Sequence, residues 1–231
     1  MTAIAENLMR VRERIESAAA RSTMDAADIL LIAVSKTKPT SLLEEALAAG
    51  ATDLGENRVQ EAVEKHGEIG DRANWHLIGH LQTNKVKHAV RVFDMIHSVD
   101  RLQLGQEISK RCEALGKKIP VLVQVKTSDE ESKSGIAPAE AEELIGHLAG
   151  LPGIMVMGLM TIPAFADDPN DSRPAFSELR KLRDRLVATA IDGVEMRYLS
   201  MGMSNDFEAA IEEGSNLVRV GTAIFGARPQ P

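Results

Sequence analysis

Short apolar runs alternate with helical segments along almost the whole chain, and this alternation constrains the fold more than any other feature. A short, unbroken apolar run is typical of a strand in a parallel sheet that is covered on both faces. Ile29–Ser35 is such a run, and with it the chain offers eight strand candidates: Ile29–Ser35, Asp53–Asn57, Trp75–Gly79, Met95–Val99, Val121–Lys126, Val156–Thr161, Met196–Ser200 and Leu217–Gly221. Helical segments between them include Leu42–Ala49, Leu102–Leu115, Ala139–Leu148 and Phe176–Ala188. We therefore predict an α/β fold with residues 1–231 as one (β/α)₈ barrel domain of the TIM type.

An open, doubly wound sheet is the alternative architecture. Its phosphate-binding fingerprint would be a glycine-rich turn after the first strand. This chain has Ser35-Lys36-Thr37-Lys38-Pro39 at that place, which favours the closed barrel. Before the first strand, the segment Glu6–Arg21 repeats apolar residues at three- and four-residue spacing. This spacing predicts an extra N-terminal helix that covers one end or one flank of the barrel.

Charge and composition exclude several classes of function. The net charge is −7, and no segment concentrates lysine and arginine among aromatic residues, so we expect no nucleic-acid partner. No apolar run approaches the roughly 20 residues that span a bilayer. The single cysteine, Cys112, and the charged N-terminus indicate a cytoplasmic protein. His76 and His80 have a metal-like spacing but lie on a predicted strand, so we expect no metal site. We expect a monomer.

Lys36 is the first candidate for chemistry, because binding groups of barrels lie at the carboxyl ends of strands. If the strand alternates regularly, Leu30, Ile32, Val34 and Lys36 share one face, and Lys36 points into the barrel mouth. Desolvation there lowers the pKa of an amine, and a neutral amine can attack an aldehyde. Lys38 has the same parity, but it precedes Pro39 and is expected to be a solvated loop residue.

A second candidate region is Ser200-Met201-Gly202-Met203-Ser204-Asn205-Asp206, between the seventh strand and a helix expected to begin near Ser204. Gly202 allows close approach of the backbone, Ser200 and Ser204 offer hydroxyls, and a helix start attracts anions. The segment therefore predicts a phosphate site. The alternative for Ser204 is a plain helix N-cap.

The eighth strand contributes Arg219, which alternation places inside the barrel between the outward Val218 and Val220. A buried arginine needs a partner, which could be a carboxylate, a ligand phosphate or an electron-rich ring nitrogen. A structural ion pair with Glu56 competes with these ligands. Gly221 and Thr222 follow in the next loop, where barrels often bind phosphate.

Three weaker candidates remain. Asn57 could bind a ligand oxygen or cap the helix that starts at Arg58. Lys133 is expected to be a solvated loop lysine, with cofactor handling as the alternative. The irregular segment Pro163–Pro174, which contains Asp167, Asp168 and Asp171, is either a lid or a plain surface loop.

With these residues placed, the sequence resembles the pyridoxal phosphate homeostasis proteins, whose barrel is similar to the N-terminal domain of alanine racemase. The resemblance covers nearly the whole chain. It is carried by seven blocks in order, Ala33–Pro39, Gly55–Asn57, Trp75–Gly79, Ser132–Ile136, Gly158–Met160, Ser200–Ser204 and Arg219–Gly226. His80 stands where many members have proline, which affects only contacts near the third strand.

The resemblance implies that pyridoxal 5′-phosphate (PLP) forms a Schiff base with Lys36. It further implies that Arg219 approaches the pyridine nitrogen, that Asn57 lies near the cofactor, and that the phosphate is surrounded by Ser200, Gly202, Ser204, Gly221 and Thr222, with Met203 in the same loop.

The implied function is intracellular PLP homeostasis, including delivery to PLP-requiring apoenzymes, without substantial turnover. An arginine at the pyridine nitrogen makes a poorer electron sink than a carboxylate would. Racemisation also needs a second acid-base group, and we expect no second domain to supply one. A racemase-like enzyme, a class I aldolase-like enzyme and a pure interaction protein stay as alternatives.

Overall fold

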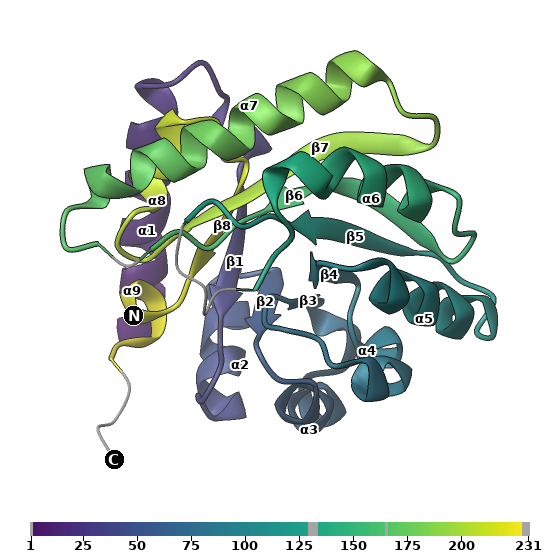
Figure 1. The fold of residues 1–231 in the computed structure, drawn as a ribbon. Coiled ribbons are helices and arrows are strands. Elements are labelled where there is room, and N and C mark those ends of the chain that lie inside the picture. Colours follow the sequence, from purple (N-terminus) through teal and green to yellow (C-terminus); the bar gives the residue numbers. More distant parts are fainter. Residues whose placement is uncertain (1, 129–133, 165, 228–231) are drawn as a thin grey trace.

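The computed structural model describes residues 2–128, 134–164 and 166–227, and it confirms the predicted barrel. Eight parallel strands pair in sequence order, and β1 closes the barrel by pairing with β8 (Figure 1). The strands are β1 Leu30–Val34, β2 Asp53–Glu56, β3 Asn74–Leu77, β4 Met95–Val99, β5 Ile119–Gln124, β6 Ile154–Met160, β7 Val194–Met203 and β8 Leu217–Val220. Most bounds agree with the predicted ones within two residues. β7 is longer at both ends, because its pairing with β6 begins at Val194 and its pairing with β8 reaches Met203.

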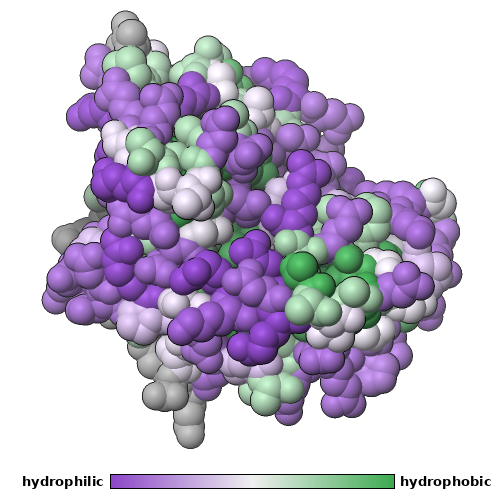
Figure 2. All heavy atoms as spheres, turned by 90° about the horizontal axis from the view of Figure 1, so that it is seen from above, coloured by the Kyte–Doolittle hydropathy of each residue, from purple (hydrophilic) through white to green (hydrophobic). Residues whose placement is uncertain are grey.

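Helices follow the strands and form the outer layer of the barrel. The α-helices are α1 Ala3–Ala20, α2 Thr40–Ala48, α3 Val59–Ile69, α4 Val86–Val92, α5 Leu102–Glu113, α6 Ala141–Ala149, α7 Arg173–Thr189, α8 Phe207–Glu212 and α9 Thr222–Phe225. Short 3₁₀ helices are η1 Ala26–Asp28, η2 Gly70–Arg72, η3 Thr83–Lys85, η4 Pro138–Glu140 and η5 Pro169–Ser172. Seen from above the view of Figure 1, the surface is mostly hydrophilic with a small apolar patch, as expected for helices that bury one face (Figure 2).

The N-terminal helix α1 lies on the flank of the barrel (Figure 1). Its apolar residues Leu8, Val11, Ile15 and Ala18 are buried, as the periodicity predicts. α1 contacts α2 on one side and α8 and α9 on the other. The helix that follows β8, α9, has only four residues. α1 therefore fills the position in the helix ring that a full-length helix after β8 would otherwise occupy.

Two apolar layers fill the fold, one inside the barrel and one between the sheet and the helices. Ile32, Val34 and Leu217 belong to the inner cluster, and Ala33, Val218 and Val220 to the outer one. The alternation predicted for β1 and β8 is therefore confirmed.

The segment 163–174 differs from the predicted irregular loop. It contains η5 and the first two residues of α7, and the carboxylate of Asp168 accepts the N–H of Asn170 at 2.9 Å at the start of η5. Lys133 lies outside the described residues. Within the described ranges, no helix is long and apolar enough to cross a membrane, and no cluster of potential metal ligands occurs.

Candidate functional site

Lys36 follows β1 at the carboxyl end of the barrel, where the sequence places it. Ile32 and Val34 point inward, and Ile32 pairs with Arg219 of β8. The next strand, β7, pairs Met203 with the same arginine. Lys36, Arg219 and the loop after β7 therefore belong to three adjacent strands. The structure brings together the three regions that sequence analysis selected separately.

Lys38 is not a solvated loop lysine, so this expectation is wrong. Its Nζ donates hydrogen bonds to the carbonyls of Phe225, Gly226 and Ala227 at 2.9–3.1 Å. The last carbonyls of a helix have no hydrogen-bond partner within the helix, and a lysine side chain placed next to them can supply one. Lys38 thus fastens the turn after β1 to the end of α9, and its amine is occupied.

Ser204 joins the loops that follow β7 and β8. The expected helix start near Ser204 is wrong, since α8 begins at Phe207. The Ser204 hydroxyl instead accepts the backbone N–H of Gly221 at 3.0 Å and that of Ala223 at 3.3 Å. Ser204 therefore caps the next helix, α9, across the gap between two strands.

Both glycines of this region lie where the fold leaves little or no room for a side chain. Gly202 has φ +88°, and a Cβ there would come within 2.5 Å of the Ala210 Cβ. A Cβ on Gly221 would come within 3.3 Å of the Val34 carbonyl oxygen. Gly202 therefore needs glycine, Gly221 leaves little room for a side chain, and the backbone is uncovered at the junction of the two loops.

The donor set at this junction fits a phosphate. Within the described part of the chain, the backbone N–H groups of Ser204, Asn205 and Thr222 donate to no protein acceptor. Thr222 adds a hydroxyl. Since α8 and α9 are short, backbone N–H groups at the meeting of two loops, rather than a long helix dipole, are the suitable anion donors.

Arg219 points into the barrel and is 3% exposed. Its Nη1 donates to Ser200 Oγ at 2.6 Å and its Nη2 to the Thr161 carbonyl at 2.8 Å. Burial lowers the pKa of Arg219 to about 10, so it stays a cation at neutral pH. A guanidinium has five N–H groups, so donors remain for a ligand on its other side.

The competing ion pair between Arg219 and Glu56 is not formed. Glu56 pairs with Leu77 in the sheet and faces the helices, whereas Arg219 pairs with Ile32 and faces the interior. The Glu56 carboxylate accepts from Lys65 Nζ at 2.7 Å and from Ser35 Oγ at 2.6 Å. Burial raises the pKa of Glu56, and these hydrogen bonds only partly offset it.

Behind Arg219 runs an interior polar chain of five residues, namely Asp53, His76, His97, Ser200 and Arg219. Asp53 Oδ1 lies 2.9 Å from His76 Nε2, and His76 Nδ1 lies 3.0 Å from His97 Nε2. His97 Nδ1 lies 3.0 Å from Ser200 Oγ, which accepts from Arg219. These residues come from β2, β3, β4, β7 and β8, so the chain crosses the whole barrel.

One assignment of protons satisfies every atom of the interior polar chain. Burial alone would raise the pKa of Asp53, but hydrogen bonds from His76, Thr52 and Asn74 hold it below its ordinary value. Burial, together with the charges of His76 and Arg219, puts the pKa of His97 well below 6.5. The carboxylate then accepts from His76, which accepts from His97, and His97 accepts from the Ser200 hydroxyl. The chain thus links a buried cation to a buried anion through oriented dipoles.

The remaining sequence candidates are placed more simply. Asn57 directly follows β2 and is half-buried, but it is not a helix cap, since α3 begins after Arg58 without a side-chain cap. His80 is half-exposed, 3.9 Å from the Asp100 carboxylate. His76 is buried in the interior polar chain, in the structural role expected for it.

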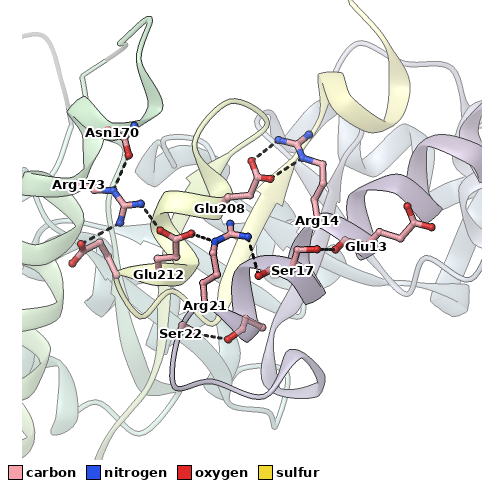
Figure 3. A network of polar contacts seen from close by, with 11 residues as sticks. Glu13, Arg14, Ser17, Arg21, Ser22, Asn170, Arg173, Glu208 and Glu212 are labelled. Carbon is pink, nitrogen blue, oxygen red and sulfur yellow. Dashed lines mark hydrogen bonds and ion pairs between the residues drawn. The ribbon is translucent and has the colours of Figure 1, made fainter.

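Charged residues on the outside hold α8, which follows the loop after β7, against α1 and α7 (Figure 3). Arg14 makes a bidentate contact with Glu208, at 2.7 and 3.1 Å. Arg21 and Arg173 both contact Glu212. Such partly exposed pairs contribute little one by one, but here they form a network around a single short helix.

Sequence reasoning missed His97, Asp53 and Thr161 as parts of the site. The available signal was parity, because His97 shares the face of Met95, which lies in the inner apolar cluster. A polar residue at an inward position of a barrel strand needs a partner. Identifying that partner requires the register of all eight strands, which the sequence does not contain.

Comparisons with known proteins agree with this geometry. The family described as "Alanine racemase, N-terminal domain" matches residues 1–229. The "Pyridoxal phosphate homeostasis protein" of Aquifex aeolicus is 44% identical over 96% of this chain and 97% of its own length. The protein of the same name from Escherichia coli strain K12 is 44% identical over 99% and 98%.

Solved structures show the same fold. PipY of Synechococcus elongatus with PLP bound has a TM-score of 0.85 and 35% identity, covering 96% of this chain and all of its own (100%). The alanine racemase of Clostridium difficile 630 has a TM-score of 0.74 at 19% identity, and the match covers 98% of this chain but 57% of the racemase, which is a likeness of fold alone. The chain belongs to the alanine racemase N-terminal domain family and, within it, to the pyridoxal phosphate homeostasis proteins.

Proposed function

We propose that this protein binds PLP at the mouth of its barrel, as a Schiff base on Lys36, and that it buffers or delivers the cofactor without substantial turnover. The observation that carries the proposal is the convergence of three groups on adjacent strands. These are the Lys36 amine after β1, the buried Arg219 cation on β8, and the bare N–H groups where the β7 and β8 loops meet. Each group matches one part of PLP: its aldehyde, its ring nitrogen and its phosphate.

Lys36 would hold the aldehyde carbon, Arg219 would face the ring nitrogen, and Ser204, Thr222 and the backbone at Gly202 and Gly221 would surround the phosphate. PLP supplies an aldehyde that condenses reversibly with an amine, with loss of water. Reversibility suits a carrier, which must release its cargo to an apoenzyme. We propose that one chain suffices for this role, since all these groups come from a single barrel.

Two features support a carrier over a racemase. Arg219 stays cationic and cannot protonate the ring nitrogen as a carboxylic acid could. The chain has one tyrosine, Tyr198, which lies two residues before Ser200 in β7. Ser200 pairs with Leu217, which pairs with Leu30 at the start of β1. Tyr198 is therefore at the amino end of the barrel, away from Lys36.

Reduction of the PLP-loaded protein with borohydride should tag Lys36, because Lys36 follows β1 at the mouth of the barrel, where we propose that PLP binds. The tag is located by peptide mapping, and the visible absorption of the linkage should disappear in parallel. Lys36→Arg should give no tag at this position. Lys38 is held by three carbonyls, so a tag found chiefly on Lys38 or Lys133 would contradict the assignment of Lys36.

Ser204→Ala is expected to weaken binding of PLP by about tenfold more than binding of pyridoxal, because losing a half-buried acceptor of two N–H groups costs roughly 1–3 kcal/mol. Loosening of the loops after β7 and β8 should affect PLP alone, because pyridoxal has no phosphate to bind there. Ser200→Ala is the comparison variant, since the Ser200 hydroxyl belongs to the interior polar chain. It should weaken both ligands by similar factors in equilibrium titrations. Equal weakening by Ser204→Ala would place the phosphate elsewhere.

A further inference from the structure

The backbone around Lys36 forms a tight turn with an unfavourable residue in it. The N–H of Lys38 donates to the Ser35 carbonyl at 3.0 Å, which makes Lys36 and Thr37 the central residues of a four-residue turn. Thr37 has φ +64°. A positive φ at the third position characterises a type II turn and is usually supplied by glycine, whereas a β-branched residue is strained there. The turn therefore needs support from outside itself.

That support comes from α3. Lys65 Nζ donates to the Ser35 carbonyl at 2.7 Å, and Glu61 Oε1 accepts the Thr37 N–H at 2.5 Å. The Ser35 carbonyl belongs to the peptide unit before the Lys36 Cα, and the Thr37 N–H belongs to the unit after it. Both peptide units that flank Lys36 are thus held from the same helix, which fixes the direction of its side chain.

The supporting groups also hold one another. Lys65 contacts Glu61 and Glu56, each at 2.7 Å, and Glu56 accepts from the Ser35 hydroxyl. We call Glu56, Glu61 and Lys65 the α3 brace. The side chains of Lys65 and Glu56 are 7% and 0% exposed, so water competes little with their contacts.

The α3 brace lies behind the sheet, on the opposite side from the proposed ligand. Ser35 and Glu56 face the helix layer, whereas Val34 and Asp53 face the barrel interior. The members of the α3 brace therefore act on the site only through the backbone of the turn. A strained backbone conformation that is held by its surroundings, as at Thr37, is typical of functional sites.

We propose that Glu61 and Lys65 are positioning residues, which hold the strained turn so that the Lys36 amine points at the PLP aldehyde. This inference rests on the proposed function. It predicts that losing the contact of Glu61 with Thr37 lets the turn relax toward a negative φ at Thr37. The Lys36 amine then points away from the PLP aldehyde in most molecules, and capture of PLP slows.

The test measures how fast PLP becomes reducible by borohydride on Lys36. Glu61→Ala should slow this capture about 5- to 30-fold, the factor that corresponds to the 1–2 kcal/mol cost of a left-handed non-glycine residue. Glu61→Gln keeps an acceptor for the Thr37 N–H and should stay within about threefold of the unchanged protein. Glu64→Ala is the matched control, because Glu64 is an exposed residue of the same helix.

The double variant Glu61→Ala with Thr37→Gly separates positioning from general stability. Glycine adopts a positive φ without steric cost, so the double variant should recover capture to within about threefold of Thr37→Gly alone. Thermal unfolding is followed in parallel, because a merely structural role of Glu61 would change the melting temperature and leave the capture rate unaffected.

Unchanged capture in Glu61→Ala, or a double variant as slow as Glu61→Ala, would overturn the inference. If the unchanged protein itself shows no reducible linkage on Lys36, the proposed function fails instead. The two failures are therefore distinguishable in one set of measurements.

Discussion

L-Alanine incubated with the PLP-loaded protein in deuterated water should keep its α-hydrogen, and no D-alanine should form. We expect exchange at least about a hundredfold slower than with an alanine racemase, because one correctly placed acid-base group is worth roughly 10²–10⁴ in rate. The single tyrosine lies at the far end of the barrel, and in the proposed binding mode the Arg219 cation would leave the ring nitrogen without a proton. Proton NMR of the alanine α-position measures the exchange directly.

The control is an alanine racemase at equal PLP occupancy under the same conditions. Transfer of PLP from the loaded protein to an apoenzyme should still be measurable as recovered apoenzyme activity. Arg219→Glu tests the cause, since a carboxylate can stabilise a proton on the ring nitrogen, provided that circular dichroism shows the fold intact. Rapid exchange by the unchanged protein would make an enzyme the better description, with an acid-base group other than those named here.

Stability should fall steeply when the pH drops below about 6.5, because His97 stays neutral in the folded protein and takes up a proton when unfolded. The unfolded state then binds one more proton than the folded state, so the free energy of unfolding decreases by about 1.4 kcal/mol per pH unit. The decrease continues until the folded protein itself protonates His97. Urea unfolding in steps of about one pH unit, from about pH 7.5 to about 4.5, measures the slope.

His97→Asn should remove most of this slope, whatever its effect on stability at pH 7. The comparison variant is His88→Asn, since His88 is exposed and should leave the slope unchanged. The groups that face His97 are His76, Ser200 and Arg219, and an added proton on His97 would be repelled by the Arg219 cation. A free energy of unfolding that stays flat from pH 6.5 to about 4.5 would show that His97 is charged in the folded state.

Local patterns were enough to predict the barrel, the place of Lys36 at the carboxyl end of β1, and the inward direction of Arg219. Strand parity depends only on residues close in sequence, and the apolar runs of β1 and β8 are regular enough to reveal it. The burial of one face of α1 follows from spacing in the same way. These features could be predicted because a single element determines each of them.

Features that depend on several elements could not be predicted. Ser204 has the sequence context of an N-cap for α8, yet its hydroxyl caps α9, because closure of the barrel brings the β8 loop beside it. Lys38 looks like a solvated lysine until the end of α9 is placed against it. The contact of Lys65 with the Ser35 carbonyl spans 30 residues and requires the packing of α3 on β1.

The place of α1 in the helix ring affects the order in which the chain can fold during synthesis. α1 is synthesised before α8 and α9, which cover one of its sides. The ion pair of Arg14 cannot form until Glu208, which is 194 residues further along the chain, has been synthesised. Contacts of such long sequence separation form late and slowly. A nascent chain without β8 would therefore expose the apolar face of α1, which is a suitable binding surface for chaperones until the last strand closes the barrel.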